Sequence, residues 1–292
     1  MTQLAAARTN PSIIMVVGVG GAGGNAVNHM WNLGIKGVDF MVCNTDQQAL
    51  DKSPVELKVR LGSEGLGAGN DPENGRKAAI ESLDVVRQRF EASGTKMVFI
   101  TAGMGGGTGT GASPVIAKLA KEMGMLTVGI VTSPLAVEGK IRYEQAFRGI
   151  EELRQNVDSL LIINNENILE IYGRLALKQA FGKADDILAS AAKGIAEIIT
   201  VESDLVNVDF ADVSKVMRDS GRAHMSVATA ARRQPGRGGG RSVAAFAPVG
   251  SQPDFRSPQH SAQYLGGQCR RVDVRGGGAD SGVYSGACQR RG

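Results

Sequence analysis

Residues 103–111 form an almost uninterrupted glycine–threonine segment, Gly-Met-Gly-Gly-Gly-Thr-Gly-Thr-Gly. It follows the apolar run Met97–Ala102, which is typical of a buried strand, and precedes the apolar helical run Ala112–Glu122. Glycines let backbone N–H groups approach an anion closely, and a helix N-terminus adds partial positive charge. A flexible glycine linker would not stand between a buried strand and an apolar helix. The segment therefore predicts a phosphate-binding turn.

Strand-like and helix-like segments alternate over residues 12–200. Continuous apolar runs separated by helices predict an α/β fold, a Rossmann-like parallel sheet with helices on both faces. Ligands bind such sheets outside the carboxyl ends of the strands. The predicted strands are 12–20, 39–46, Met97–Ala102, Leu126–Ser133 and Ser159–Asn165. The predicted helices are Asn25–Leu33, Pro72–Glu91, Ala112–Glu122, Ile141–Asn156 and Leu175–Ile199, with a short helix ending near Met225.

A second glycine-rich turn follows the first predicted strand. Residues 18–25 read GVGGAGGN, which fits the dinucleotide pattern G-x-G-x-x-G, and Asp46 at the end of the next strand would suit a ribose. An NAD-dependent enzyme is therefore one interpretation, and a tight turn without a ligand is another. Two phosphate-binding turns, the first ending in the polar Asn25, favour a nucleoside di- or triphosphate. The chain has no GxxxxGK[ST] segment and is not a P-loop NTPase.

These motifs resemble the FtsZ family of bacterial tubulin-like cell-division GTPases over about residues 12–225. The resemblance implies a tubulin/FtsZ GTPase domain that binds GTP or GDP, with Mg²⁺ accompanying the nucleotide. It also implies GTP hydrolysis and head-to-tail polymerisation into the division ring. The family signature GGGTGTG stands at Gly105–Gly111, and the other similar segments are Gly18–Asn28, Asn44–Leu50, Gly65–Gly69, Glu138–Arg142 and Asn207–Val213.

The resemblance also implies which residues hold the phosphates. Ala68, Gly69 and Asn70 would form the loop that senses the γ-phosphate. The family often has Ala at the last of these positions, so Asn70 is a departure. The other implied phosphate-binding residues are Gly20, Gly21, Ala22, Gly23, Gly24 and Asn25 in the first turn, and Gly105, Gly106, Gly107, Thr108, Gly109, Thr110 and Gly111 in the second.

The remaining implied ligands concern the ribose and the base. Glu138 and Arg142 match residues on the ribose and phosphate side, and Thr132 joins the nucleotide-binding set. In the guanine pocket the ring of Phe181 would stack on the base, while Asn165 and Asp185 would read its edge. A carboxylate that accepts from the guanine N1–H and amino group is the physical basis for preferring GTP over ATP.

Two carboxylates, Asp209 and Asp212, lie three residues apart at a predicted loop-to-helix junction, so both can point the same way. Such acids can hold a cation and orient a water toward a phosphoryl group. Helix capping is the structural alternative. The resemblance implies that these acids, supported by Asn207, complete the nucleotide site of the next subunit in a filament. That interface is heterologous and open-ended. No resident metal site is predicted.

The resemblance ends after Met225. Residues 226–292 contain ten Arg, three Asp and no Lys or Glu, which gives +7 and leaves −3 of the net +4 for residues 1–225. They have no strand alternation or long apolar face, which predicts disorder. Reading one base out of frame from Arg232 to Tyr264 permits a helix, a turn and an apolar strand like the family's continuation. We infer a frameshift near 225–231, genuine or from sequencing error; a natural Arg/Gly-rich nucleic-acid-binding tail is the alternative.

We therefore expect four segments: a flexible N-terminus (1–11), a GTP-binding domain (12–174), a core helix with the activation loop and a short helix (175–225), and the aberrant tail (226–292). With its C-terminal domain lost, the chain could alternatively be a GTP-binding fragment that cannot polymerise productively.

Cellular location and partners are also expectations. Three Cys without metal or disulfide spacing, no secretory signal and no apolar run of about 18 residues favour a cytoplasmic protein without membrane insertion. Cys43 reads as a small core residue. The family implies a midcell division site and other division proteins as partners, although the C-terminal peptide that usually binds them is absent. No nucleic-acid partner is expected.

Overall fold

Within the part of the chain that the structure describes, a seven-stranded parallel sheet organises the fold. The computed structural model describes residues 12–172, 177–200 and 210–222. The strand order is β3-β2-β1-β4-β5-β6-β7, and every pairing is parallel. The strands are β1 (Ile14–Val19), β2 (Asp39–Asn44), β3 (Leu57–Arg60), β4 (Met97–Gly103), β5 (Leu126–Ser133), β6 (Ser159–Asn164) and β7 (Gly221–Arg222).

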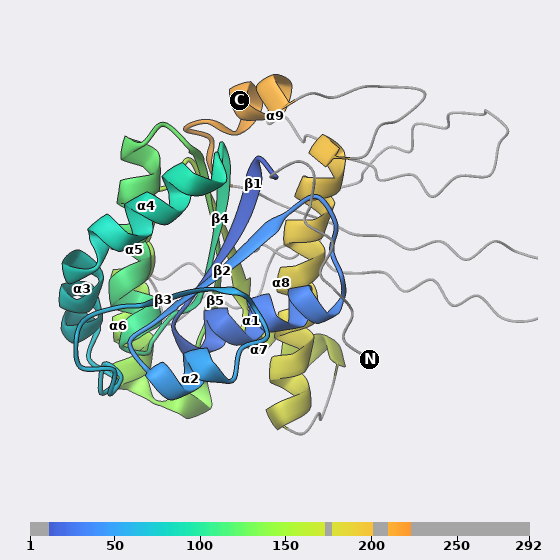
Figure 1. The fold of residues 1–292 in the computed structure, drawn as a ribbon. Helices are drawn as coiled ribbons and strands as arrows, with labels where there is room; N and C mark the ends of the chain where they lie inside the picture. Colours follow the sequence, from blue (N-terminus) through green and yellow to red (C-terminus); the bar gives the residue numbers. More distant parts are fainter. Residues whose placement is uncertain (1–11, 173–176, 201–209, 223–292) are drawn as a thin grey trace, which may run out of the picture. The chain divides into compact units, whose positions relative to one another are not determined.

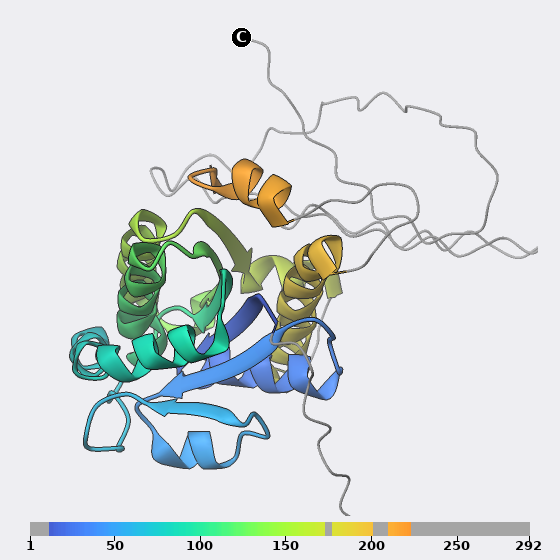
Figure 2. The ribbon, with the colours of Figure 1, turned by 45° about the horizontal axis from the view of Figure 1, so that its top comes forward.

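Helices cover both faces of this sheet, as predicted (Figure 1). On one face α5 packs against β4 and β5 and is itself covered by α3, α4 and α6, while α1 and α8 pack together on the other (Figure 2). The helices are α1 (Gly20–Asn32), α2 (Gln47–Asp51), α3 (Pro72–Glu81), α4 (Leu83–Ser93), α5 (Thr108–Glu122), the 3₁₀ turn η1 (Ala136–Glu138), α6 (Lys140–Gln155), α7 (Asn165–Tyr172), α8 (Leu177–Thr200) and α9 (Phe210–Met217).

The five predicted strands are confirmed. Their apolar runs give a clear sequence signal because the strands are buried on both faces; every residue of β1 and β5, for example, is buried. Cys43 in β2 is also a core residue, and burial raises the pKa of its thiol to about 12. The two short edge strands β3 and β7 were not predicted. Their four and two residues are too short to give a periodic signal.

The predicted single helix 72–91 is instead two helices that meet at Ser82. This buried serine accepts a hydrogen bond from the Gly62 N–H at 2.9 Å and donates one to the Arg60 carbonyl at 3.4 Å. The hydroxyl thereby ties the helix junction to the end of β3. Because its two partners lie 20 and 22 residues away in the sequence, the junction depends on tertiary contacts that the local sequence does not reveal.

Both glycine-rich turns are shorter than predicted, because α1 already begins at Gly20 and α5 at Thr108. A Cβ on Gly20 would lie 2.7 Å from the Gly109 nitrogen, so these two helix starts touch through their backbones. Behind them, a Cβ on Gly75 of α3 would lie 2.5 Å from the Gly107 carbonyl oxygen. Missing side chains therefore let α1, α3 and α5 converge at the carboxyl ends of the central strands.

None of the described helices is long and apolar enough to cross a bilayer. The predicted tail 226–292 and the N-terminal segment 1–11 lie outside the described residues.

This convergence makes a prediction about stability. Gly75→Ala should destabilise the fold by about 1–3 kcal/mol, because the added methyl overpacks a backbone contact. Gly182→Ala is the matched control: it changes another helical glycine, whose Cβ would meet nothing within 4 Å, so helix propensity alone should stabilise by about 0.5–1 kcal/mol. Urea unfolding of both variants measures the effect. Equal effects of the two substitutions would contradict tight packing at Gly75.

Candidate functional site

A cavity of about 520 Å³ opens at the carboxyl ends of β4, β5 and β6. It lies beside the point where the strand order reverses between β1 and β4, the usual ligand position in open parallel sheets. The predicted residues that line it are Gly21, Ala22, Asn25, Gly106, Gly107, Thr108, Gly109, Thr132, Glu138, Arg142, Asn165 and Asp185. Gly103 and Met104 also line it; they open the predicted phosphate-binding segment 103–111 but were not named as ligands. Sequence reasoning missed four others at the end of β5 and on α8, namely Ser133, Pro134, Ala184 and Leu188.

The glycines of the two turns divide into two groups. Gly21 and Gly106 line the cavity, and a Cβ on either would meet nothing within 4 Å, so these positions leave room for a ligand. Other glycines are needed for backbone packing: a Cβ on Gly109 would lie 2.5 Å from the Gly103 oxygen. Gly20, Gly23, Gly107 and Gly111 are likewise closely packed, whereas Gly24 is open.

The two threonines of the second turn also differ. Thr110 is buried, and its hydroxyl accepts a hydrogen bond from the Gly105 N–H at 2.8 Å, so it shapes the turn from behind. Thr108 lines the cavity, and its hydroxyl lies 2.7 Å from the hydroxyl of Thr45. Thr45, which follows β2, therefore supports the turn although sequence reasoning did not single it out.

The loop with Ala68 and Gly69 contacts the second turn, since a Cβ on Gly107 would lie 2.8 Å from the Ala68 Cβ. Gly69 and Asn70 both have left-handed backbones, with φ of +60° and +61°. Asparagine adopts this conformation more readily than alanine does. The departure at Asn70 thus suits the local backbone, and its carbonyl accepts a hydrogen bond from Gln145 at 3.4 Å.

The cavity holds few charges. Arg142 donates to the Glu138 carboxylate at 2.8 Å, and the other oxygen of Glu138 accepts from the Leu135 N–H at 2.9 Å. This bonding fixes the turn after β5 and leaves the Arg142 charge partly neutralised. Positive potential for an anion therefore comes mainly from the backbone N–H groups at the starts of α1 and α5.

Two side chains at the α7–α8 side of the cavity are poised for hydrogen bonding. The Asn165 side-chain oxygen is buried and has no hydrogen-bond partner among the described residues. Burial raises the pKa of Asp185 to about 6, the nearby His29 opposes this rise and the neighbouring Asp186 adds to it. His29 on α1 is bound to Asp186 at 2.8 Å. The predicted stacking residue Phe181 belongs to α8, but its side chain lies outside the described residues.

The predicted catalytic acid Asp212 lies on α9, at the other end of the sheet from the cavity. β7, the strand after α9, pairs with Ser159 and Leu160 at the start of β6. The cavity lies beyond the opposite, carboxyl end of β6. Asp209 and Asn207 lie outside the described residues, so their approach to Asp212 stays a prediction.

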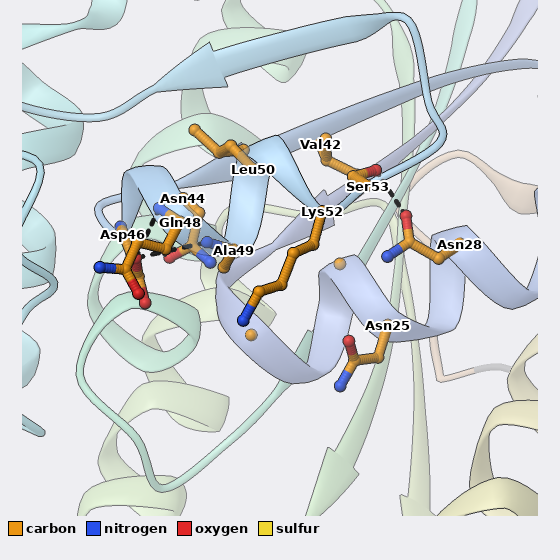
Figure 3. A pocket seen from close by; sticks show the side chains of 12 residues that line it. Asn25, Asn28, Val42, Asn44, Asp46, Gln48, Ala49, Leu50, Lys52 and Ser53 are labelled. Atoms are coloured by element: carbon orange, nitrogen blue, oxygen red, sulfur yellow. Dashed lines mark hydrogen bonds between the residues drawn. The ribbon is translucent and has the colours of Figure 1, made fainter.

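A second pocket of about 280 Å³ lies between α1 and α2 and shares Gly21 and Asn25 with the first (Figure 3). Its edge includes Asp46, whose carboxylate accepts from the Gln48 and Ala49 N–H groups and caps α2. Helix capping therefore explains why an acid stands at position 46, and the ribose contact of the dinucleotide interpretation is not needed. Among the described residues, no group of three or more His, Cys, Asp or Glu could hold a metal ion.

Comparison with known proteins agrees with this geometry. Residues 13–173 match the GTPase domain of the tubulin/FtsZ family. This chain belongs to the tubulin/FtsZ family. It is 52% identical over 219 residues to the cell division protein FtsZ of Porphyromonas gingivalis, covering 74% of this chain and 48% of that protein. The FtsZ of Wigglesworthia glossinidia brevipalpis is also 52% identical, over 74% of this chain and 57% of its own length. The chain thus spans about half the length of these relatives.

Solved structures give the same result. An empty FtsZ dimer from M. jannaschii aligns at 44% identity with a TM-score of 0.69, covering 74% of this chain and 63% of that one. A GTPγS-bound protofilament of CetZ2 from Haloferax volcanii shares the fold at 23% identity, with a TM-score of 0.62 and coverage of 74% and 67%. Family membership excludes the NAD-dependent enzyme as an interpretation.

The division of the glycines predicts separable effects on binding and folding. Gly106→Val should weaken guanine-nucleotide binding by about tenfold or more, equivalent to at least about 1.4 kcal/mol, because the side chain occupies the cavity. The melting temperature should change little, since a Cβ at this position meets no protein atom within 4 Å. Gly106→Ala should give a smaller loss, and Gly182→Val on the exposed side of α8 should leave binding unchanged. Fluorescence titration and thermal melting measure both quantities; a large fall in melting temperature would make Gly106 a packing residue.

Proposed function

We propose that this chain binds GTP and hydrolyses it at sites completed between subunits of a head-to-tail polymer, the polymer of the bacterial division ring. The observation that carries the proposal is the position of the candidate catalytic acid. Asp212 belongs to the end of the domain opposite the nucleotide cavity. An acid at that end suits the cavity of a neighbouring subunit.

Distances along one helix support this separation. The cavity is lined by Thr108, the first residue of α5, whereas Asp219, just after α9, binds Lys121 near the end of α5 at 2.9 Å. A helix of 15 residues is roughly 20 Å long. The segment that carries Asp212 is therefore attached about 20 Å from its own phosphate-binding turn, and translation along the sheet axis would bring it to the next subunit's cavity.

Apolar side chains at both ends suit a contact between copies of this chain. Around the cavity, Leu66, Val137 and Ile141 are 86%, 80% and 72% exposed, and Val216 on α9 is 77% exposed. Joining one end to the other would remove these side chains from water, which is favourable. Because the two surfaces differ, the contact is heterologous and propagates as a filament.

The described residues of the cavity fit a guanine nucleotide. Gly21 and Gly106 leave space for phosphates beside the helix starts, and the unpartnered Asn165 oxygen can accept from a ligand N–H. Asp185, when ionised, can accept from the N1–H and amino group of guanine. Mg²⁺ would come with the nucleotide, held by phosphate oxygens and water, which is usual where protein ligands are few. Bound there, it would neutralise phosphate charge during hydrolysis.

The raised pKa of Asp185 predicts pH-dependent nucleotide binding. The ionised carboxylate accepts from guanine, so affinity for GDP should be full above pH 6 and fall as the pH drops through about 6. Below that value the Asp185 carboxyl must give up one proton before guanine binds. The affinity for GDP should therefore fall by about tenfold for each further pH unit. Asp185→Asn should remove this dependence and the preference for guanine over adenine. Calorimetric titration between pH 5 and 8 tests it; a profile identical in the two proteins would assign the titration to a group other than Asp185.

Mixing two inactive variants tests catalysis between subunits. Asp212→Ala should bind GTP normally but lose turnover, and Gly106→Val should lose turnover because it binds GTP poorly. A mixture should regain activity, because Asp212 of the Gly106→Val chain completes the intact cavity of the Asp212→Ala chain. Phosphate release measures this, with each variant alone as control. If the mixture stays inactive while the wild-type chain turns over, catalysis occurs within one subunit; if the wild-type chain binds GTP without turnover, it behaves as the assembly-incompetent fragment.

The wider role follows from the family and forms part of the same proposal. A division-ring polymer would act in the cytoplasm at midcell and meet other division proteins there.

A further inference from the structure

We infer that Lys121 is a positioning residue that holds α9, and with it Asp212, through two carboxylates. The inference rests on the proposed role of Asp212. The Lys121 ammonium lies 2.9 Å from the Asp219 carboxylate and 3.5 Å from that of Asp158. These three residues come from the end of α5, the start of β6 and the turn after α9, and we refer to them as the α9 anchor.

The centre of the anchor is Asp158, whose side chain is fully buried. One of its oxygens accepts from the Thr127 N–H of β5 at 2.8 Å, and the other from the Asp219 N–H at 3.4 Å. Its own carbonyl accepts from the Gly221 N–H at 2.9 Å, which aligns β7 beside β6. A buried carboxylate without a counter-ion is costly, so Lys121 and the segment after α9 compensate the same charge.

Among the described residues, the helix itself is covered only in part. No residue of α9 is buried. A longer hydrogen bond, 3.4 Å from the Arg218 side chain to the Gly124 carbonyl, lies at the same end of the helix. Apolar burial of α9 is therefore only partial, at Phe210, Val213 and Met217, and polar contacts at the carboxyl end of the helix add to it in setting its position.

Backbone geometry at the anchor supports the same conclusion. Asp219 has a left-handed backbone, with φ of +53°, which is uncommon for a residue other than glycine. This conformation turns the chain from α9 into β7 while its carboxylate faces Lys121. Lys121 in turn holds the pKa of the Asp219 carboxyl below its usual range. The ion pair therefore persists at neutral pH, where GTP turnover would occur.

The test compares Lys121→Met with Lys118→Met in the full chain. Both residues lie on α5, but Lys118 pairs only loosely with Glu122 at 3.9 Å and lies outside the anchor. Lys121→Met should accelerate amide exchange of residues 210–217 by about tenfold or more while leaving GDP affinity within about twofold. In turnover it should lower kcat by about tenfold at unchanged KM, the pattern of a misplaced catalytic group. Lys121→Arg should restore most of the slow amide exchange and most of kcat, and Lys118→Met should change neither quantity.

A second variant covers poor folding of Lys121→Met. Asp219→Asn keeps the side-chain size and tolerates the left-handed backbone, and should change the same amides in the same direction. Unchanged exchange at 210–217 in both variants would overturn the inference, and so would accelerated exchange across the whole domain, which indicates a general stabilising role. If the wild-type chain shows no turnover, the proposed function fails, whereas the exchange comparison still decides whether Lys121 holds α9.

Discussion

Close backbone contact between three helices is the constraint on which this structure depends. The starts of α1 and α5 and the middle of α3 meet without side chains between them, at Gly20, Gly109 and Gly75. Because these contacts lie beside the point where the strand order reverses, they bring two helix N-termini to the same cavity. Many glycines of the two turns are therefore needed for backbone packing. This packing fixes the positions of Gly21 and Gly106, which leave space in the cavity.

The same arrangement explains how a cavity with few cations can suit a polyanion. Glu138 and Asp185 contribute two carboxylates to its lining, and Arg142 is already bound to Glu138. Side-chain charge alone would thus favour cations. Two helix starts with uncapped N–H groups offset this, because neither α1 nor α5 has a side-chain cap at its first turn. Phosphate oxygens can take the places that capping side chains would otherwise occupy.

Much of this could be predicted from sequence, and the failures have physical causes. Apolar runs identified the five long strands because burial on both faces leaves a continuous signal, whereas β3 and β7 are too short to leave one. Twelve of the residues named by motif resemblance line the cavity, but the resemblance could not separate Gly106, which has open space beside it, from Gly109, which packs on Gly103. That difference depends on a neighbouring strand rather than on local sequence. The left-handed backbone at Asn70 and the unpartnered oxygen of Asn165 likewise depend on tertiary structure.

The anchor of α9 carries this reasoning to the other end of the domain. Lys121, Asp158 and Asp219 are ordinary charged residues, without a motif that would single them out, and only the fold brings them together. The helix that they hold buries no residue of its own, so it keeps an exposed face for a partner. A rigid phosphate-binding turn at one end of α5 and a polar attachment at the other give the domain two unlike ends. Under the proposed function, chemistry divided between such ends would depend on contact with another copy of the chain, and hydrolysis would then follow from assembly rather than from binding alone.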